Sequence, residues 1–404
     1  MNIFQTNKVL TEFSVFLILL TISIPIFNAI NSIAIVLNFG LIFLFYKYRK
    51  SKFMLVPRLI IIGIVSFTLL LFVASFAIYD EGSISYAFKF LYWMLPFFLV
   101  FFSVQICKNF KIEVYSLTTA LFVSVIAVLY QYYILDKIRP GGLYFHPNQF
   151  ASMMDILLPF ATMFILKNAY ECKNKFFVII SFVSVFLGFY ALFLSGSRGG
   201  LLGVFLGFLL CVVCYALRNL KLTHFFLTLL SLIILFVGTV FIAYDSIPDL
   251  FQRRYDTERL LLIESSYNMW NDHKLFGVGL DNWNEEYNNK YRLPEAKEKL
   301  DMPHNILAFF FSTTGLIGGI GYIIYNGAIF IFLIKCLYKC RNKQTIFIIL
   351  GMLWALFAIN IHGMVDVGLN NKFVMRLFSG MLGLTVAYLC LEEKGDYKIE
   401  RSKC

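Results

Sequence analysis

Residues 245–303 have the sequence DSIPDLFQRRYDTERLLLIESSYNMWNDHKLFGVGLDNWNEEYNNKYRLPEAKEKLDMP, which leads directly into His304-Asn305. The segment is the only long hydrophilic stretch of an otherwise apolar chain, and it contains Arg259. Apolar stretches on both sides of such a segment predict a membrane scaffold that holds it at one surface of a bilayer. We expect the active site in this segment, on the face turned away from the cytoplasm.

The composition is that of a membrane protein. Of the 404 residues, 59% are hydrophobic and 15% are charged, whereas soluble domains have about 25% charged residues. Apolar runs of roughly 20 residues recur along the chain, and each is long enough to cross a hydrocarbon core of about 30 Å. A net charge of +11 would suggest nucleic acid as the partner of a soluble protein. Here we attribute it to membrane orientation and expect no nucleic-acid partner.

These apolar runs predict an all-α polytopic bundle of about twelve transmembrane helices. We expect residues 1–404 to form a single membrane domain, with 245–303 as a large extracytoplasmic loop between spans nine and ten. The run that follows His304 is too long for one span, and its glycines near 315–321 predict a short surface helix followed by a true crossing. The expected spans are 10–27, 29–46, 59–78, 88–106, 114–135, 150–166, 176–195, 199–217, 224–244, 304–334, 345–366 and 373–391.

The basic residues predict the orientation. Twelve crossings place both termini on one side, and most Lys and Arg residues outside 245–303 lie in the turns of that side. By the positive-inside tendency this side is cytoplasmic. The segment 245–303 contains no cysteine, whereas the eight cysteines lie in or near the expected cytoplasmic half, as a reducing compartment favours. The pair Cys211 and Cys214 lies within an apolar helix, and we expect it to be structural.

Four polar clusters fall at the expected outer ends of spans: 139–148, 195–200, the surroundings of Arg259, and 303–305. We expect Ser197 to cap the helix that begins at Arg198, and Pro303 to occupy the first turn of the helix that carries His304. Helix starts attract phosphate, and the planar fork of arginine matches pairs of phosphate oxygens. Together the clusters predict a site for a polyanionic lipid head group. The expected substrate-binding residues are Arg139, His146, Asn148, Ser197 and Asn305.

The catalytic candidates are Arg198, Arg259 and His304. An imidazole has a pKa near neutrality that neighbouring groups such as Asp301 can tune, and this suits a general base for a sugar hydroxyl. Each candidate also has a structural alternative. Arginines can anchor span ends in the membrane interface, and the histidine can have a purely structural role.

Three ionisable residues, Asp155, His362 and Asp366, fall within the expected spans, where such groups are functional candidates. His362 and Asp366 are four residues apart, so they would share one helix face and either hold the bundle together or line an acceptor path. Asp155 could neutralise an arginine. No metal-ligand spacing, Walker loop or dinucleotide fingerprint occurs, so we expect no metal and no cofactor.

Three motifs follow one another between residues 194 and 318. They are Leu194-Ser195-Gly196-Ser197-Arg198-Gly199-Gly200; Arg259 followed by Trp270 and Leu275-Phe276-Gly277-Val278-Gly279; and Pro303-His304-Asn305 followed by Thr314-Gly315-Leu316-Ile317-Gly318. As an ordered set they resemble the O-antigen ligase and polymerase superfamily of bacterial envelope glycan assembly. One position departs from the family pattern, since Lys274 stands where proline is usual.

The resemblance implies a GT-C-like, metal-independent glycosyltransferase of the bacterial inner membrane, with a periplasmic active site. Its donor would be a glycan on undecaprenyl pyrophosphate. Arg198 and Arg259 match family positions that bind the pyrophosphate, and His304 matches the position that activates the acceptor hydroxyl.

The acceptor separates the two activities within the superfamily. A ligase transfers the polymer to lipid A-core, whereas a polymerase transfers it to a second lipid-linked glycan. The stretch 143–146 and residues 287–290 are more similar to ligases, which we therefore favour over an O-antigen or capsular repeat-unit polymerase. A third possibility is a proton-coupled transporter whose protons pass through His362 and Asp366; it would place its polar residues near the membrane midplane.

Overall fold

A computed structural model describes residues 3–25, 28–49, 53–107, 110–171, 175–219 and 254–393. Within these ranges the regular secondary structure is helical. The expected span 224–244 and residues 245–253, with Arg253, lie outside the described residues.

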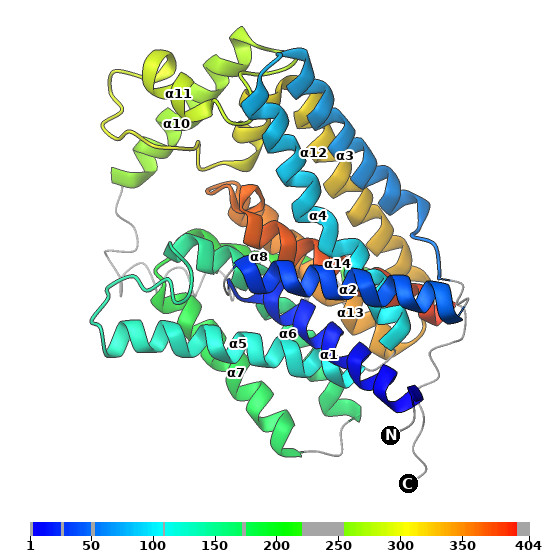
Figure 1. The fold of residues 1–404 in the computed structure, drawn as a ribbon. Coiled ribbons are helices and arrows are strands. Elements are labelled where there is room, and N and C mark those ends of the chain that lie inside the picture. The colour runs from blue at the N-terminus through cyan, green and yellow to red at the C-terminus, as the bar shows by residue number, and fades with distance from the viewer. Residues whose placement is uncertain are drawn as a thin grey trace.

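Every other expected span coincides with a helix of the structure (Figure 1). The helices are α1 (Ile3–Ser23), α2 (Asn28–Arg49), α3 (Arg58–Ala77), α4 (Glu81–Cys107), α5 (Phe110–Tyr133), α6 (Pro147–Glu171), α7 (Lys175–Leu194), α8 (Arg198–Asn219), α10 (Arg254–Asp272), α11 (Trp283–Glu286), η2 (Tyr287–Tyr291), α12 (Ile306–Lys339), α13 (Lys343–Gly363), η3 (Gly368–Asn370) and α14 (Lys372–Glu393). Seven of them, α3, α4, α5, α8, α12, α13 and α14, are long and apolar enough to cross a membrane. The chain is a multi-pass membrane protein with an all-helical fold, and the total of about twelve crossings stays a prediction.

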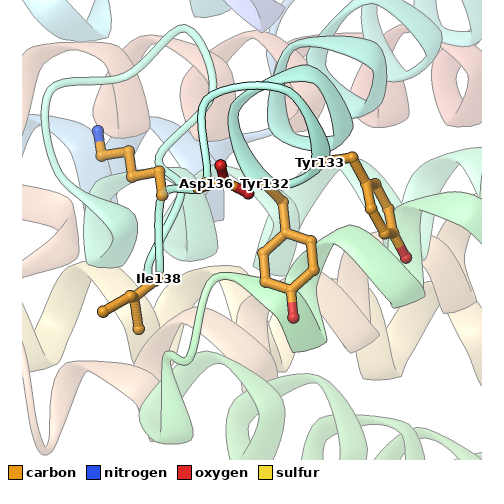
Figure 2. Close-up of a pocket in the computed structure, with 5 residues that line it drawn as sticks. Tyr132, Tyr133, Asp136 and Ile138 are labelled. Carbon is orange, nitrogen blue, oxygen red and sulfur yellow. The ribbon is translucent and has the colours of Figure 1, made fainter.

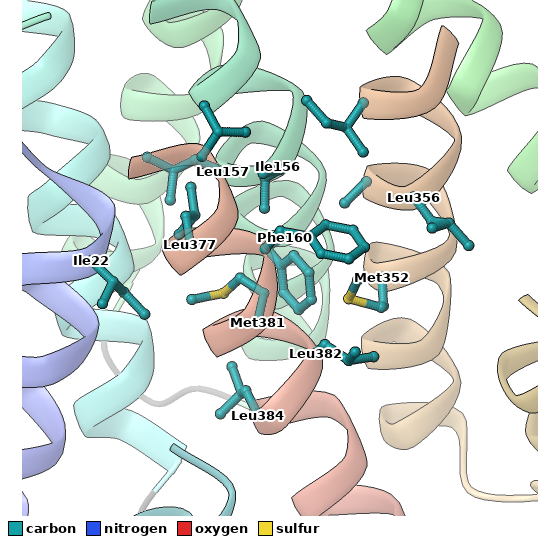
Figure 3. Packing of buried hydrophobic residues seen from close by; sticks show 14 of the residues in the cluster. Ile22, Ile156, Leu157, Phe160, Met352, Leu356, Leu377, Met381, Leu382 and Leu384 are labelled. Carbon is teal, nitrogen blue, oxygen red and sulfur yellow. The ribbon is translucent and has the colours of Figure 1, made fainter. Parts of the chain in front are cut away.

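Helix α14 lies at the centre of the bundle. In its most apolar stretch 94% of the residues are buried inside the protein, against 39% in α3. Figure 3 shows Leu377, Met381 and Leu382 of α14 surrounded by side chains of α1, α6 and α13. A helix that is apolar on all sides can lie in such a position, because neighbouring helices replace lipid around it.

Helices α8 and α13 pack closely because α8 carries glycines at four-residue spacing. A Cβ atom at Gly203 would lie 2.6 Å from the Ala358 carbonyl oxygen, and one at Gly207 would lie 2.8 Å from the Ala358 nitrogen. The two backbones therefore meet along this stripe, and the indole of Trp354 donates a hydrogen bond to the Val204 carbonyl at 2.7 Å. The glycine spacing of α8 thus forms a close-packing face for α13.

Helix α12 is broken at Gly315, as its glycines predict. Gly315 has φ 62° and ψ −160°, a conformation outside the helical region that favours glycine. The break exposes backbone groups, and residues 274–279 bond to them. The N–H groups of Leu316 and Ile317 donate to the carbonyls of Lys274 and Leu275 at 2.8 and 3.3 Å.

The exchange is reciprocal. The carbonyls of Ser312 and Thr313, which residues 316 and 317 would bond in a continuous helix, accept from Val278 and Gly279 at 2.9 and 2.8 Å. We call this pairing of 274–279 with 312–317 the backbone clamp. It explains why the Gly277-Val278-Gly279 motif and the Thr314-Gly315 motif occur in one chain.

Residues 254–303 form a small helical cap with its own apolar cluster, although the sequence predicted a loop. Trp283 stacks on Tyr287 with ring centroids 4.8 Å apart, and its indole donates to the hydroxyl of Ser266 at 3.1 Å. The cluster consists of Leu262, Met269, Val278, Trp283, Tyr287 and Tyr291. Figure 1 shows α10 and α11 beyond the ends of α3, α4 and α12, which we call the cap end of the bundle.

Candidate active site

The candidate base lies immediately before α12. Asn305 is the N-cap: its side-chain oxygen accepts from the Ala308 N–H at 2.9 Å, and its amide donates to the Met364 carbonyl at 2.9 Å. The helix therefore begins at Ile306, and the expectation that Pro303 occupies its first turn is wrong. His304 instead precedes the helix with φ 48°, a left-handed conformation that is uncommon for a residue with a side chain.

This conformation accompanies a contact between His304 and Asp366. The imidazole Nδ1 lies 3.4 Å from Asp366 Oδ1, and the two side chains are 26% and 13% exposed. The expected neighbour Asp301 accepts a hydrogen bond from Asn284 within the cap instead. The carboxyl group paired with His304 therefore comes from a position 62 residues further along the chain.

Asp366 follows the end of α13, so it does not extend the helix of His362 as the sequence predicted. Burial by itself would raise the pKa of the Asp366 carboxyl. The hydrogen bond with His304 and the charge of His362 outweigh burial and lower this pKa to about 2. The Val367 N–H also donates to the carboxylate at 2.7 Å. Asp366 is therefore a carboxylate at neutral pH.

A second imidazole, that of His362, lies further into the bundle. His362 Nε2 lies 4.0 Å from Asp366 Oδ2, and His362 Nδ1 lies 2.6 Å from Asp155 Oδ2. The partner of Asp155 is thus a histidine, and the expectation that Asp155 neutralises an arginine is wrong. Two carboxylates and two imidazoles alternate in the order Asp155, His362, Asp366, His304; we call them the acid–imidazole row.

The start of α8 packs against this row. The hydroxyl of Ser197 accepts from the Gly200 N–H at 3.4 Å, so Ser197 caps the helix as the sequence predicted. A Cβ atom at Gly199 would lie 2.6 Å from His362 Cδ2. The glycine therefore allows the first turn of α8, which begins at Arg198, to approach the His362 ring closely.

Arg259 lies in α10 of the cap and is half-buried. It is close enough to His362 for a weak electrostatic interaction. Beside Arg259, the buried Glu258 accepts from the Lys297 N–H at 3.2 Å, which ties α10 to the end of the cap. The three predicted catalytic residues thus come from three separate segments. His304 contacts Asp366 of the row, Arg198 begins the helix that packs on His362, and Arg259 interacts with His362 at longer range.

With this geometry in view, comparison with known protein families gives one match: residues 183–323 match the O-antigen ligase family. Over these residues the chain is similar to the O-antigen ligase and polymerase superfamily, as the motifs predicted. All three motifs quoted above lie inside the matched residues, together with Arg198, Arg259 and His304. No curated protein matches the chain.

Part of the row lies outside the stretch that matches the family. Asp155, His362 and Asp366 fall before or after residues 183–323. Sequence spacing gave no sign that Asp366 would meet His304 or that Asp155 would meet His362. The available signal was the rarity of ionisable residues inside membrane helices, which marked all three as candidates.

Arg139, a predicted substrate-binding residue, joins the start of α8 from the loop after α5. Its guanidinium donates to the carbonyls of Ser195 and Gly196, each at 3.4 Å, and to the side-chain oxygen of Asn148 at 3.3 Å. The structure thus brings Arg139 and Asn148 together with the turn that precedes Arg198. Gln131, which the sequence analysis missed, holds this loop by accepting from the Gly141 and Gly142 N–H groups at 3.1 and 2.9 Å.

His146 is the predicted binding residue that the structure sets apart from the row. Its side chain is exposed and lies edge-on to the ring of Phe145, with centroids 4.8 Å apart. Its carbonyl accepts from the Phe150 N–H at the start of α6. His146 therefore has a structural role in the turn that leads into α6.

Two open surface cavities lie elsewhere on the described part of the protein, and neither is lined by a residue of the row. One, of about 350 Å³, lies at the end of α5 and is lined by Tyr132, Tyr133, Asp136, Lys137 and Ile138. Figure 2 shows both tyrosine rings projecting beside this loop. The other, of about 390 Å³, is lined by Ile78 and residues 271–277 of the cap. Within the described part of the chain, no three His, Cys, Asp or Glu side chains are placed to hold a metal ion.

Proposed function

We propose that this membrane protein is an O-antigen ligase that transfers a glycan from undecaprenyl pyrophosphate to lipid A-core, without a metal ion, at the periplasmic face of the bacterial inner membrane. The proposal is supported above all by the contact of His304 with Asp366, next to which the start of α8 packs on His362 and Arg259 lies within electrostatic range of the same ring. The similarity of residues 183–323 to the O-antigen ligase family supports glycan transfer in general. The donor, the acceptor and the site roles are our proposal.

In this mechanism His304 removes the proton from the acceptor hydroxyl. Its Nδ1 faces the Asp366 carboxylate, so the proton of the neutral ring belongs on Nδ1 and the lone pair on Nε2. The acceptor oxygen attacks the anomeric carbon of the donor sugar, its proton passes to Nε2, and the bond between the sugar and the pyrophosphate breaks. Asp366 then stabilises the imidazolium that forms.

The cationic groups act on the leaving group. The electron pair of the broken bond remains on the pyrophosphate, whose negative charge therefore grows in the transition state. Arg198 at the capped start of α8 and Arg259 from the cap would stabilise that charge, helped by the free N–H groups of the helix start. Arg139, Asn148, Ser197 and Asn305 would maintain the surrounding backbone and contact the substrate.

The alternative is a repeat-unit polymerase, which uses the same donor chemistry with a second lipid-linked glycan as acceptor. A proton-coupled transporter is less well supported. His362 occupies the last turn of α13 and Asp366 lies beyond its end, whereas a transporter would keep its ionisable residues near the midplane.

The deciding experiment reconstitutes the purified protein with a lipid-linked glycan and offers lipid A-core or a second lipid-linked glycan, with a chelator present. We expect a product on lipid A-core, and loss of at least about 100-fold in His304→Ala and Arg259→Ala. His273→Ala and Arg292→Ala are matched controls, because both residues are exposed in the cap. Product only on the lipid-linked acceptor would assign a polymerase, and unchanged transfer in both site variants would refute the site.

A further inference from the structure

A buried arginine lies in the bundle outside the acid–imidazole row. Arg376, in α14, is 7% exposed, and its Nε atom is buried without a hydrogen-bond partner. No Asp or Glu of the described ranges forms an ion pair with it. A guanidinium has five N–H donors and no acceptor, and burying it without an anion is costly. Its contact with the ring of Tyr92, 4.9 Å from the centroid, offsets only part of that cost.

Two lysines accompany Arg376 along the α4–α14 contact. These helices run parallel, since Tyr86 donates to Asn370 at 3.2 Å just before α14, whereas Gly383 abuts Phe97 further along. Lys89 lies three residues before Tyr92 on α4, and Lys372 lies four residues before Arg376 on α14, so each shares a helix face with the contact. Both lysines reach aromatic rings, Tyr86 and Phe373, at 4.9 and 4.8 Å.

The strip lies near the start of α14, at one end of the bundle. Arg376 is the fifth residue of α14, which places it about 6 Å from the helix start. Lipid phosphates lie just outside the hydrocarbon core. The adjoining surface of α4 faces lipid, since Phe88, Leu91 and Tyr92 are 56%, 44% and 39% exposed.

We propose that Arg376, Lys89 and Lys372 form a binding site for the phosphate group of an anionic membrane lipid, at the cap end of the bundle. The planar fork of Arg376 would hold two phosphate oxygens, the lysines would add charge, and the exposed aromatic side chains would contact the acyl chains. The site is separate from Arg198 and Arg259, and it does not depend on the proposed transfer reaction.

Retention of lipid by the purified protein in native mass spectrometry tests this proposal. We expect the wild type to retain phosphatidylglycerol in preference to phosphatidylcholine, and Arg376→Gln to weaken that retention roughly tenfold. Arg376→Lys should lie between them, because it keeps the charge and loses the fork. Arg341→Gln is the matched control, since Arg341 is exposed in the turn between α12 and α13.

Two further arms keep the test decisive. Lys89→Gln and Lys372→Gln alter less buried positions, and each should also weaken lipid retention. They provide the test if Arg376→Gln does not fold. Excess inorganic phosphate should not displace the lipid; displacement by phosphate alone would assign a site for a free anion and overturn the lipid assignment. Retention equal to that of the wild type in all three glutamine variants would also overturn it.

Discussion

At the level of single residues, Asp366 has the most consequential position in the molecule. It stands between two imidazoles, 3.4 Å from that of His304 and 4.0 Å from that of His362. A carboxylate in this position selects the tautomer of His304. The row continues into the bundle, where His362 contacts Asp366 on one side and Asp155 on the other.

Replacing Asp366 by asparagine tests this positioning. The amide N–H₂ can face the imidazole Nδ1 as a donor and so favour the opposite tautomer, in which Nε2 has no lone pair for the acceptor. We expect transfer to fall roughly 100-fold in Asp366→Asn while donor binding stays unchanged. Asp301→Asn is the control, because Asp301 pairs with Asn284 in the cap. Wild-type turnover in Asp366→Asn would exclude Asp366 as the group that orients His304.

The lowered pKa of Asp366 also predicts how stability depends on pH. The folded-state pKa of about 2 lies below the ordinary value of 3.8. The carboxylate therefore stabilises the folded state above about pH 4, and that contribution, roughly 2 kcal/mol, is lost as the pH falls towards 2. Thermal unfolding in detergent should show a gap in stability between wild type and Asp366→Asn, and this gap should narrow as the pH falls over this range. A gap that stays constant down to pH 2 would contradict the assignment.

Among the elements, the backbone clamp has the greatest influence on the site. It fixes the broken helix α12, whose start follows His304, to the segment of the cap that follows α10, which carries Arg259. Four backbone hydrogen bonds at the break join the two proposed catalytic groups through a rigid connection. A continuous α12 would have no free carbonyls at residues 312 and 313, and the cap would lose this attachment.

The variant Gly315→Ala should break the clamp. A Cβ atom there would lie 2.3 Å from the carbonyl carbon of Leu275, which is backbone and cannot rotate away, and φ is positive. We expect a loss of stability of at least roughly 1–3 kcal/mol from backbone strain, with transfer reduced further than stability explains. Gly327→Ala in the same helix is the control, because a Cβ there meets nothing within 4 Å. Equal thermal stability and transfer in the two variants would show that the backbone clamp supports neither.

For the whole molecule, the placement of the cap relative to the membrane decides the function. The cap lies beside the ends of α3, α4 and α12 (Figure 1), and His304 of the acid–imidazole row follows the cap directly in the chain. Since the proposed donor is exposed in the outer leaflet, the cap must face the periplasm for the reaction to occur.

Cysteine labelling in intact cells tests this orientation. In a cysteine-free background, Lys299→Cys places an exposed thiol in the cap, and Lys343→Cys places one at the start of α13, at the other end of the bundle. A membrane-impermeant maleimide should label the first variant in intact cells and the second only after permeabilisation. The reverse pattern would put the cap in the cytoplasm and refute the proposed donor chemistry.

The sequence by itself determined the helical membrane fold, the break in α12, the N-cap of α8 at Ser197 and the glycine spacing by which α8 packs on α13. Each follows from local composition or spacing: apolar length, glycine position, or a hydroxyl before a helix start. The tertiary structure alone decided that the cap folds around Trp283, that α12 begins after Asn305, and that Asp366 meets His304 while Asp155 meets His362. These pairings join residues that are far apart along the chain, and they depend on how whole helices pack, which no local pattern specifies.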